Sequence, residues 1–192
     1  MHVGIFGGSF NPPHTAHLIV AEHIREAGAL DRILWIPAAR PPHKPATGLV
    51  APHHRLAMTR LAVAGNPAFD VSDLELHRDG PSYTVDTVRI LQDEQPGTTF
   101  TLILGGDSFR DFATWHRPDE IIRRVPLLVY DRPGTRYDDV PERFRTRACF
   151  VDAPLLEISG SDIRTRIREG RSIRYLVPEP VRRYIETHGL YR

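Results

Sequence analysis

The sequence predicts an α/β protein, built as a Rossmann-like, doubly wound parallel sheet with helices on both faces. Short β-type runs alternate with segments of helical periodicity along the whole chain, which is the pattern of strands joined by crossover helices. The first apolar run ends in a glycine pair directly before a helical segment. With 192 residues, 41% of them hydrophobic, the chain can bury one substantial core. We therefore expect a single domain over residues 1–192, with a small helical part from about 158 to 192.

The first elements follow from periodicity and from the residues that stop them. A buried strand is predicted over 2–6, and a helix over 15–27 places Leu18, Ala21 and Ile24 on one face before Gly28 ends it. The remaining predicted elements are, in order, a strand at 33–36, a proline-rich loop over 37–52, a helix over about 53–64, a strand at 71–76, a helix over 83–92, a strand at 100–104, short helices near Phe109 and Ile121, strands at 127–130 and 148–151, and helices at about 162–169 and 179–188.

Composition excludes several classes of protein. A formal net charge of +1 provides no broad basic surface for binding a nucleic-acid duplex, so small molecules are the expected partners. Cys149 has no second cysteine to pair with, which favours a reducing compartment. The first apolar run, residues 3–6, is too short for a signal peptide or a membrane span. We expect a cytoplasmic protein that does not bind membranes, and a homo-oligomer remains open.

The segment from residue 7 to 17 carries most of the functional information. Gly7 and Gly8 follow the first strand, where missing side chains let a ligand approach the backbone, and the following helix offers free N–H groups and its positive dipole end. This arrangement predicts a phosphate cradle. His14 and His17, three residues apart in the first helical turn, share the face toward that cradle. Two alternatives stay open: an ordinary tight turn with surface histidines, and zinc binding by the two imidazoles.

Two further segments offer positive charge. Lys44, the one lysine of the chain, lies in Pro41-Pro42-His43-Lys44-Pro45, a loop that either closes over phosphates or stays solvated. In Ile158-Ser159-Gly160-Ser161-Asp162-Ile163-Arg164, Ser161 is predicted to cap a helix beginning at Asp162, which leaves N–H groups and Arg164 to face an anion. A plain capped surface helix is the alternative.

Both motifs resemble signatures of one enzyme superfamily. His14-Thr15-Ala16-His17 resembles the H-x-G-H signature of nucleotidyltransferases, with Ala16 in place of glycine. The segment 158–164 resembles their I-S-S-T-x-I-R signature, with Gly160 in place of serine. The segments that extend the resemblance to the bacterial nicotinate-mononucleotide adenylyltransferases, over nearly the whole chain, are Gly7-Gly8-Ser9-Phe10-Asn11-Pro12, Pro41-Pro42-His43-Lys44, Gly80-Pro81-Ser82-Tyr83-Thr84, Gly105-Gly106-Asp107-Ser108, Thr114-Trp115, Arg132-Pro133-Gly134 and Gly189-Leu190-Tyr191-Arg192.

The resemblance implies a reaction in NAD biosynthesis. A phosphate oxygen of nicotinate mononucleotide attacks the α-phosphorus of ATP in line, giving nicotinate adenine dinucleotide and pyrophosphate without a covalent enzyme intermediate. Catalysis then depends on positioning and on charge stabilisation by Mg²⁺, which the nucleotide phosphates carry without protein ligands, and by four side chains. These are His14, His17, Lys44 and Arg164.

The resemblance also implies two sets of binding residues. ATP is expected to contact Gly7, Gly8, Ser9, Phe10, His14, His17, Gly105, Asp107, Ile158, Ser159, Ser161 and Arg164. The mononucleotide is expected to contact Asn11, His43, Lys44, Thr84, Trp115 and Arg132. Trp115 can stack on a cationic pyridinium ring, and Thr84 at a helix start can receive the pyridine carboxylate. A core tryptophan, simple helix capping by Thr84 or Asp107, and an ordinary ion pair for Arg132 are the respective alternatives.

Three other functions remain to be separated from this one. The acceptor of the adenylyl group could be nicotinamide mononucleotide or, less in keeping with an aromatic site, 4'-phosphopantetheine. A protein of another class, a sensor that binds adenine nucleotide without turnover, would use the same cradle.

Overall fold

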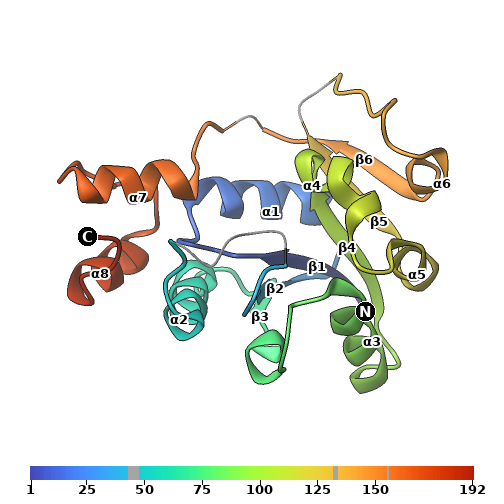
Figure 1. Ribbon diagram of the computed structural model, residues 1–192, viewed down its shortest axis with the longest axis horizontal. Coiled ribbons are helices and arrows are strands. Elements are labelled where there is room, and N and C mark those ends of the chain that lie inside the picture. Colours follow the sequence, from blue (N-terminus) through green and yellow to red (C-terminus); the bar gives the residue numbers. More distant parts are fainter. Residues whose placement is uncertain (43–47, 132–133, 155) are drawn as a thin grey trace.

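Six parallel strands form one sheet in the order β3-β2-β1-β4-β5-β6, as seen in a computed structural model (Figure 1). The structure describes residues 1–42, 48–131, 134–154 and 156–192. The strands are β1 (His2–Gly8), β2 (Arg32–Pro37), β3 (Phe69–Val71), β4 (Thr99–Gly105), β5 (Leu127–Asp131) and β6 (Ala148–Asp152). This order confirms the predicted Rossmann-like, doubly wound sheet.

The helices are placed between the strands, as the alternating sequence pattern predicts. The α-helices are α1 (Thr15–Ala27), α2 (Pro52–Val63), α3 (Thr84–Glu94), α4 (Gly106–Arg110), α5 (Pro118–Arg124), α6 (Glu142–Arg145), α7 (Gly160–Arg168) and α8 (Glu179–Thr187). Two 3-10 helices, η1 (Leu74–His77) and η2 (Asp111–Thr114), complete the described elements.

An apolar layer covers each face of the sheet. Alternate residues of β4 point to opposite faces, so Leu102 and Leu104 pack with α3 and α5, while Ile103 packs with α1. Ala21 and Ile24 of α1 are buried in that second layer, as their helical spacing predicts. The sheet is therefore packed between helices on both faces.

The winding of the chain reverses between β1 and β4. Helices α1 and α2 connect β1, β2 and β3 across one face, whereas α3 and α5 pack on the other. Because neighbouring crossovers diverge at such a switch point, a crevice opens beyond the carboxyl ends of β1 and β4. The predicted cradle follows β1 directly.

The predicted strand at 71–76 is wrong. Strand β3 begins earlier and ends at Val71, and the following residues form η1 instead. The side-chain oxygen of Ser72 accepts a hydrogen bond from the N–H of Leu74 at 3.2 Å, which turns the chain away from the sheet. Leu74 and Leu76 alternate with polar residues, and this short pattern does not distinguish a strand from a tight helical turn.

The carboxyl-terminal helices pack against α2 at one end of the molecule (Figure 1). Met58 of α2 is fully buried in a cluster with Ile163 of α7 and Val181 of α8. This third cluster joins the helical part to the sheet domain. No helix in the described ranges is long and apolar enough to cross a membrane.

Candidate active site

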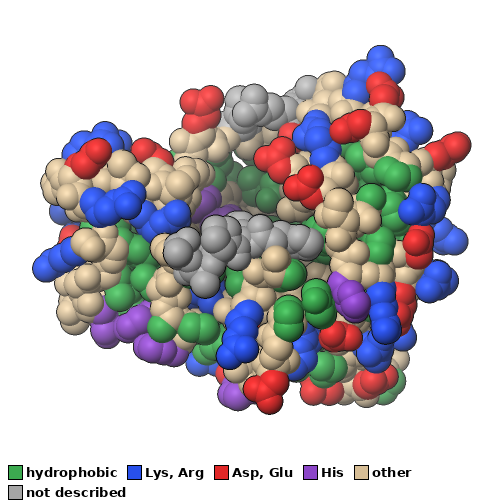
Figure 2. Space-filling view, viewed as in Figure 1, with side chains coloured by type: hydrophobic (Ala, Val, Ile, Leu, Met, Phe, Trp, Pro, Cys, Tyr) green, Lys and Arg blue, Asp and Glu red, His purple; other side chains and the backbone are tan. Residues whose placement is uncertain are grey.

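A cleft of about 990 Å³ lies at the carboxyl ends of β1 and β4, at the switch point. Figure 2 shows it as a hollow with acidic side chains on one rim. Most of the residues predicted to bind ATP line it: Gly7, Ser9, Phe10, His14, His17, Gly105, Asp107, Ile158, Ser159, Ser161 and Arg164. The mononucleotide residues Asn11 and Trp115 line it too. The sequence therefore predicted which distant segments come together here.

Two of the predicted residues do not line the cleft, and three others lie outside the described residues. Gly8 and Thr84 are not among the described residues that line it. Thr84 does begin α3 as predicted, next to Tyr83, whose ring stacks on His116 at 4.2 Å between centroids. His43, Lys44 and Arg132 lie outside the described residues.

The turn after β1 has an uncommon backbone. Phe10 adopts a φ of 43°, in the left-handed region that residues with a side chain rarely occupy. Such a conformation costs about 1–3 kcal/mol and persists where its surroundings hold it. The Phe10 ring is buried and packs at 5.7 Å from Phe6 and 5.1 Å from Trp35, between ring centroids. Packing of this ring helps to hold the cradle in shape.

The absence of a side chain has a different effect at Gly7 and at Gly8. A Cβ added to Gly7 would meet nothing within 4 Å, so its missing side chain keeps the cleft open. A Cβ on Gly8 would lie 3.0 Å from the Phe10 ring. Gly8 thus gives the turn room to form, and this is consistent with its place outside the cleft lining.

The two histidines of the signature lie stacked at the start of α1. Their ring centroids are 3.6 Å apart with an angle of 20° between the planes. The backbone N–H of His14 donates to Nδ1 of His17 at 3.2 Å, so the proton of a neutral His17 ring is on Nε2. His17 Nε2 is therefore a hydrogen-bond donor.

His14 is buried and electrically neutral at physiological pH. It is 6% exposed, and its Nδ1 has no hydrogen-bond partner within the described parts of the chain. Burial lowers the pKa of His14 from its ordinary 6.5 to about 4. A polyphosphate in the cleft would favour the protonated form, because an adjacent negative charge offsets the desolvation of the imidazolium.

Helix α7 docks on the cradle through Arg164. Nη1 of Arg164 donates to the carbonyl oxygen of Asn11 at 2.8 Å. A Cβ added to Gly160 would lie 2.9 Å from that oxygen. The serine of the family signature would place its own Cβ equally close. The departure from the family signature at Gly160 thus permits this close contact between α7 and the cradle.

The predicted helix cap is wrong by two residues. Helix α7 begins at Gly160, and Ser159 is the capping residue, with its Oγ accepting from the N–H of Asp162 at 3.1 Å. Ser159 has an extended backbone, whereas Ser161 is already inside the helix. The Ser159 hydroxyl can therefore accept a hydrogen bond from the first turn of the helix. The hydroxyl of Ser161 lies 2.9 Å from that of Ser159.

Asn11 joins three distant parts of the chain. Its side-chain amide donates to the Gly48 carbonyl at 2.8 Å. Its side-chain oxygen accepts from the N–H of Val50 at 3.2 Å and from the hydroxyl of Tyr191 at 2.9 Å. Asn11 is 5% exposed. The geometry gives it a structural task that its sequence position did not suggest.

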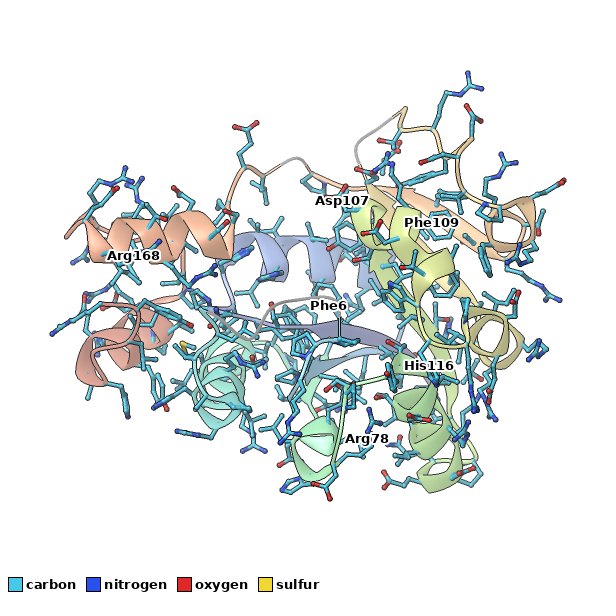
Figure 3. All side chains as sticks on the ribbon, in the orientation of Figure 1. Phe6, Arg78, Asp107, Phe109, His116 and Arg168 are labelled. Carbon is cyan, nitrogen blue, oxygen red and sulfur yellow. The ribbon has the colours of Figure 1, made fainter. Side chains whose placement is uncertain are left out.

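The opposite wall of the cleft follows β4 and β5. Asp107 and Arg110 of α4 approach to 3.4 Å, and the hydroxyl of Tyr137 donates to Asp131 at 2.7 Å. Burial, together with the two carboxylates, raises the pKa of Tyr130 to about 12, so its phenol remains a donor. Figure 3 places Asp107 on this side, above Phe6 in the sheet.

Sequence reasoning missed three residues of this wall, namely Arg110, Tyr130 and Asp131. Tyr130 ends a predicted strand, and the carboxyl ends of parallel strands meet at one edge of a sheet. That rule alone would have pointed to Tyr130 and Asp131.

Trp115 stands on the same side of the cleft. It is partly buried, lines the cleft and packs its ring against Phe112 with centroids 5.4 Å apart. Trp115 is therefore a packing residue that also lines the cleft.

Within the described residues, no group of three or more His, Cys, Asp or Glu side chains is arranged to hold a metal ion. The donors of the cradle side are imidazoles and a guanidinium, which suit anions.

Comparison with known proteins agrees with this geometry. The family described as cytidylyltransferase-like matches residues 5–166. A protein of Salinibacter ruber that is named "Probable nicotinate-nucleotide adenylyltransferase" is 59% identical over 192 residues, covering 100% of this chain and 98% of the relative. One from Exiguobacterium sibiricum is 45% identical and covers 100% and 99%, respectively.

A solved structure shares the fold. The nicotinic acid mononucleotide adenylyltransferase of Plasmodium falciparum, complexed with NaAD, superimposes with a TM-score of 0.80 at 21% identity, covering 99% of this chain and 97% of that one. The reversed winding, the cleft at the switch point and these matches define a nucleotidyltransferase of the cytidylyltransferase-like class. Within that class, the chain belongs to the nicotinate-nucleotide adenylyltransferase family.

Proposed function

We propose that the cleft holds ATP and nicotinate mononucleotide together and transfers the adenylyl group between them. The mononucleotide phosphate oxygen forms a bond to the α-phosphorus of ATP, and the bond from that phosphorus to the β-bridging oxygen breaks. Pyrophosphate leaves with the electron pair, and nicotinate adenine dinucleotide remains. The observation that carries the proposal is the stacked pair His14 and His17, at the start of α1 in a cleft that Arg164 also lines.

No side chain acts as nucleophile or obligatory base in this scheme. The attacking phosphate is already ionised near neutral pH, so the protein supplies positioning and charge stabilisation. Nε2 of His17 and the guanidinium of Arg164 donate to phosphate oxygens, and His14 gains a proton or a hydrogen bond as the polyphosphate enters. Lys44 and His43 are proposed to add positive charge from their loop.

Magnesium is proposed to arrive on the phosphates of ATP. When bound, the ion supplies charge neutralisation on the phosphate oxygens. The imidazoles and the guanidinium of the cradle then orient the same phosphates.

The acceptor is proposed to bind on the Trp115 side. A cationic pyridinium over an indole face gains about 1 kcal/mol, or more when desolvated. Thr84, at the start of α3, is proposed to receive the pyridine carboxylate, and Arg132 the mononucleotide phosphate. Asn11 is proposed to hold the approach to this site through its bonds to Gly48 and Val50.

We also propose a cytoplasmic location, on the basis of one cysteine with no partner for a disulfide.

Oxygen-18 tracing tests the direct transfer. Nicotinate mononucleotide labelled in its phosphate oxygens is incubated with ATP and Mg²⁺, and both products are analysed by mass spectrometry. Direct attack retains all of the label in the dinucleotide, one atom of it in the new bridge. Label in pyrophosphate would contradict the proposed direction of attack.

A further inference from the structure

A buried arginine lies beneath the cradle. Arg55 of α2 has 0% exposure, and no carboxylate of the described residues lies within ion-pair distance of it, although the buried carboxylate of Glu75 interacts with it at longer range. Its guanidinium is bound by backbone carbonyls. Nε donates to Val50 at 3.0 Å, Nη1 to Ser9 at 2.9 Å and to Ala38 at 2.6 Å, and Nη2 to Ala39 at 3.1 Å. A buried cation is tolerated where hydrogen bonds satisfy it in this way.

The four carbonyls come from three chain segments at the same edge of the sheet. Ser9 follows β1, Ala38 and Ala39 follow β2, and Val50 precedes α2. The N–H of Ala38 also donates to the Gly8 carbonyl at 2.9 Å. Arg55 therefore fixes the cradle backbone relative to the neighbouring loop ends.

One of these bonds sets the direction of a peptide group in the cradle. The carbonyl of Ser9 points to Arg55, and the N–H of Phe10 in the same trans peptide points the opposite way. Ser9 and Phe10 line the cleft, whereas Arg55 does not. The Phe10 N–H thus faces the side of the cleft. Because Phe10 has a φ of 43°, this orientation needs support from its neighbours.

We propose that Arg55 is a positioning residue for adenylyl transfer. By holding the Ser9 carbonyl, it aims the Phe10 N–H at a phosphate oxygen of the bound substrates. The inference rests on the proposed function of the cleft. Lysine cannot replace Arg55 in this role, since its donors radiate from one nitrogen and do not form a planar fork that reaches three segments.

The first test compares Arg55→Lys with a matched control on the same helix. Met58→Ala removes another fully buried α2 side chain, from the carboxyl-terminal cluster and not from the cradle. Loss of one preorganised donor lowers kcat by about 10²-fold or more. We expect that loss for Arg55→Lys, with much smaller changes in KM, whereas Met58→Ala lowers Tm and keeps kcat. An Arg55→Lys enzyme with normal kcat would overturn the proposal.

A second variant keeps Arg55 and removes the donor itself. Replacing the Ser9–Phe10 amide by an ester, with the α-hydroxy analogue of phenylalanine at position 10, deletes only that N–H. We expect a similar fall in kcat, and this variant decides the question if Arg55→Lys does not fold. Full activity of the ester enzyme would refute the role of the Phe10 N–H.

The proposed function and this inference fail in different ways. Wild-type protein that turned over no acceptor would refute the proposed function. In that case, calorimetry would still test Arg55 by comparing the MgATP affinity of the wild type with that of Arg55→Lys. Weakening of MgATP binding by roughly tenfold in Arg55→Lys, the equivalent of one lost hydrogen bond to a charged group, would support the inference. If the wild-type protein turns over no acceptor, equal MgATP affinities of the two proteins would overturn the inference.

Discussion

Burial of His14 should make the protein less stable as the pH falls. Its pKa is about 4 in the folded protein and 6.5 in the unfolded chain, so the unfolded chain binds more protons between these values. The stabilising effect of the neutral ring is complete above pH 6.5 and declines toward pH 4. One pKa unit corresponds to about 1.4 kcal/mol, which gives roughly 3 kcal/mol over the whole window and about 2 kcal/mol between pH 8 and pH 5.

Urea unfolding at pH 8 and pH 5 measures this effect in wild type and in His14→Gln. Wild type should lose about 2 kcal/mol more between the two pH values than the variant, which cannot titrate at that site. Burial and the neighbouring His53 and His188 also lower the pKa of His54, but that contribution is shared and cancels in the difference. The matched control, His77→Gln, removes an exposed imidazole and should behave like wild type. Equal pH dependence in wild type and His14→Gln would refute the buried, neutral His14.

Three other changes separate catalytic, binding and packing roles. His17→Ala should lower kcat by at least about 10²-fold with a cooperative thermal transition retained, since it removes a donor to the phosphates; near-normal kcat would remove His17 from the site. Trp115→Ala should raise the KM for nicotinate mononucleotide far more than that for ATP in steady-state kinetics, and an equal rise in both would indicate packing alone. Gly160→Ala should cost about 1–3 kcal/mol in urea unfolding, because its Cβ would lie 2.9 Å from the Asn11 carbonyl; an unchanged midpoint would show that α7 can shift freely.

Local chemistry made much of the site predictable. The glycine pair after an apolar run, and two histidines in one helical turn, need only short-range rules to be placed at the end of β1. The structure confirms that His14 and His17 share a face, and it stacks their rings. The helix at 15–27 is confirmed at the same bounds.

Short-range rules fail where a few residues fit two structures. The segment 71–76 has the alternation of a strand, but the side chain of Ser72 ends β3 and η1 follows. Ser161 and Ser159 are both good capping residues, and the choice between them depends on how α7 docks on Asn11.

The hydrogen bonds that support the cradle could not be predicted from the sequence, because they join residues that are far apart in the chain. Tyr191 and Asn11 are 180 positions apart, and Arg55 and Ser9 are 46 apart. A buried arginine on a helix also looks like a surface residue in sequence, since arginine is seldom buried without a carboxylate partner. Only the folded chain shows that backbone carbonyls accept the hydrogen bonds of the Arg55 guanidinium.

The choice of acceptor tests the central claim most directly. Pyrophosphate release from MgATP is measured with nicotinate mononucleotide, nicotinamide mononucleotide and 4'-phosphopantetheine in parallel, and the dinucleotide product is identified by mass spectrometry. The highest kcat/KM with nicotinate mononucleotide is the predicted result. A preference for another acceptor would contradict the roles given to Thr84 and Trp115, and no release with any acceptor would indicate a nucleotide sensor in place of an enzyme.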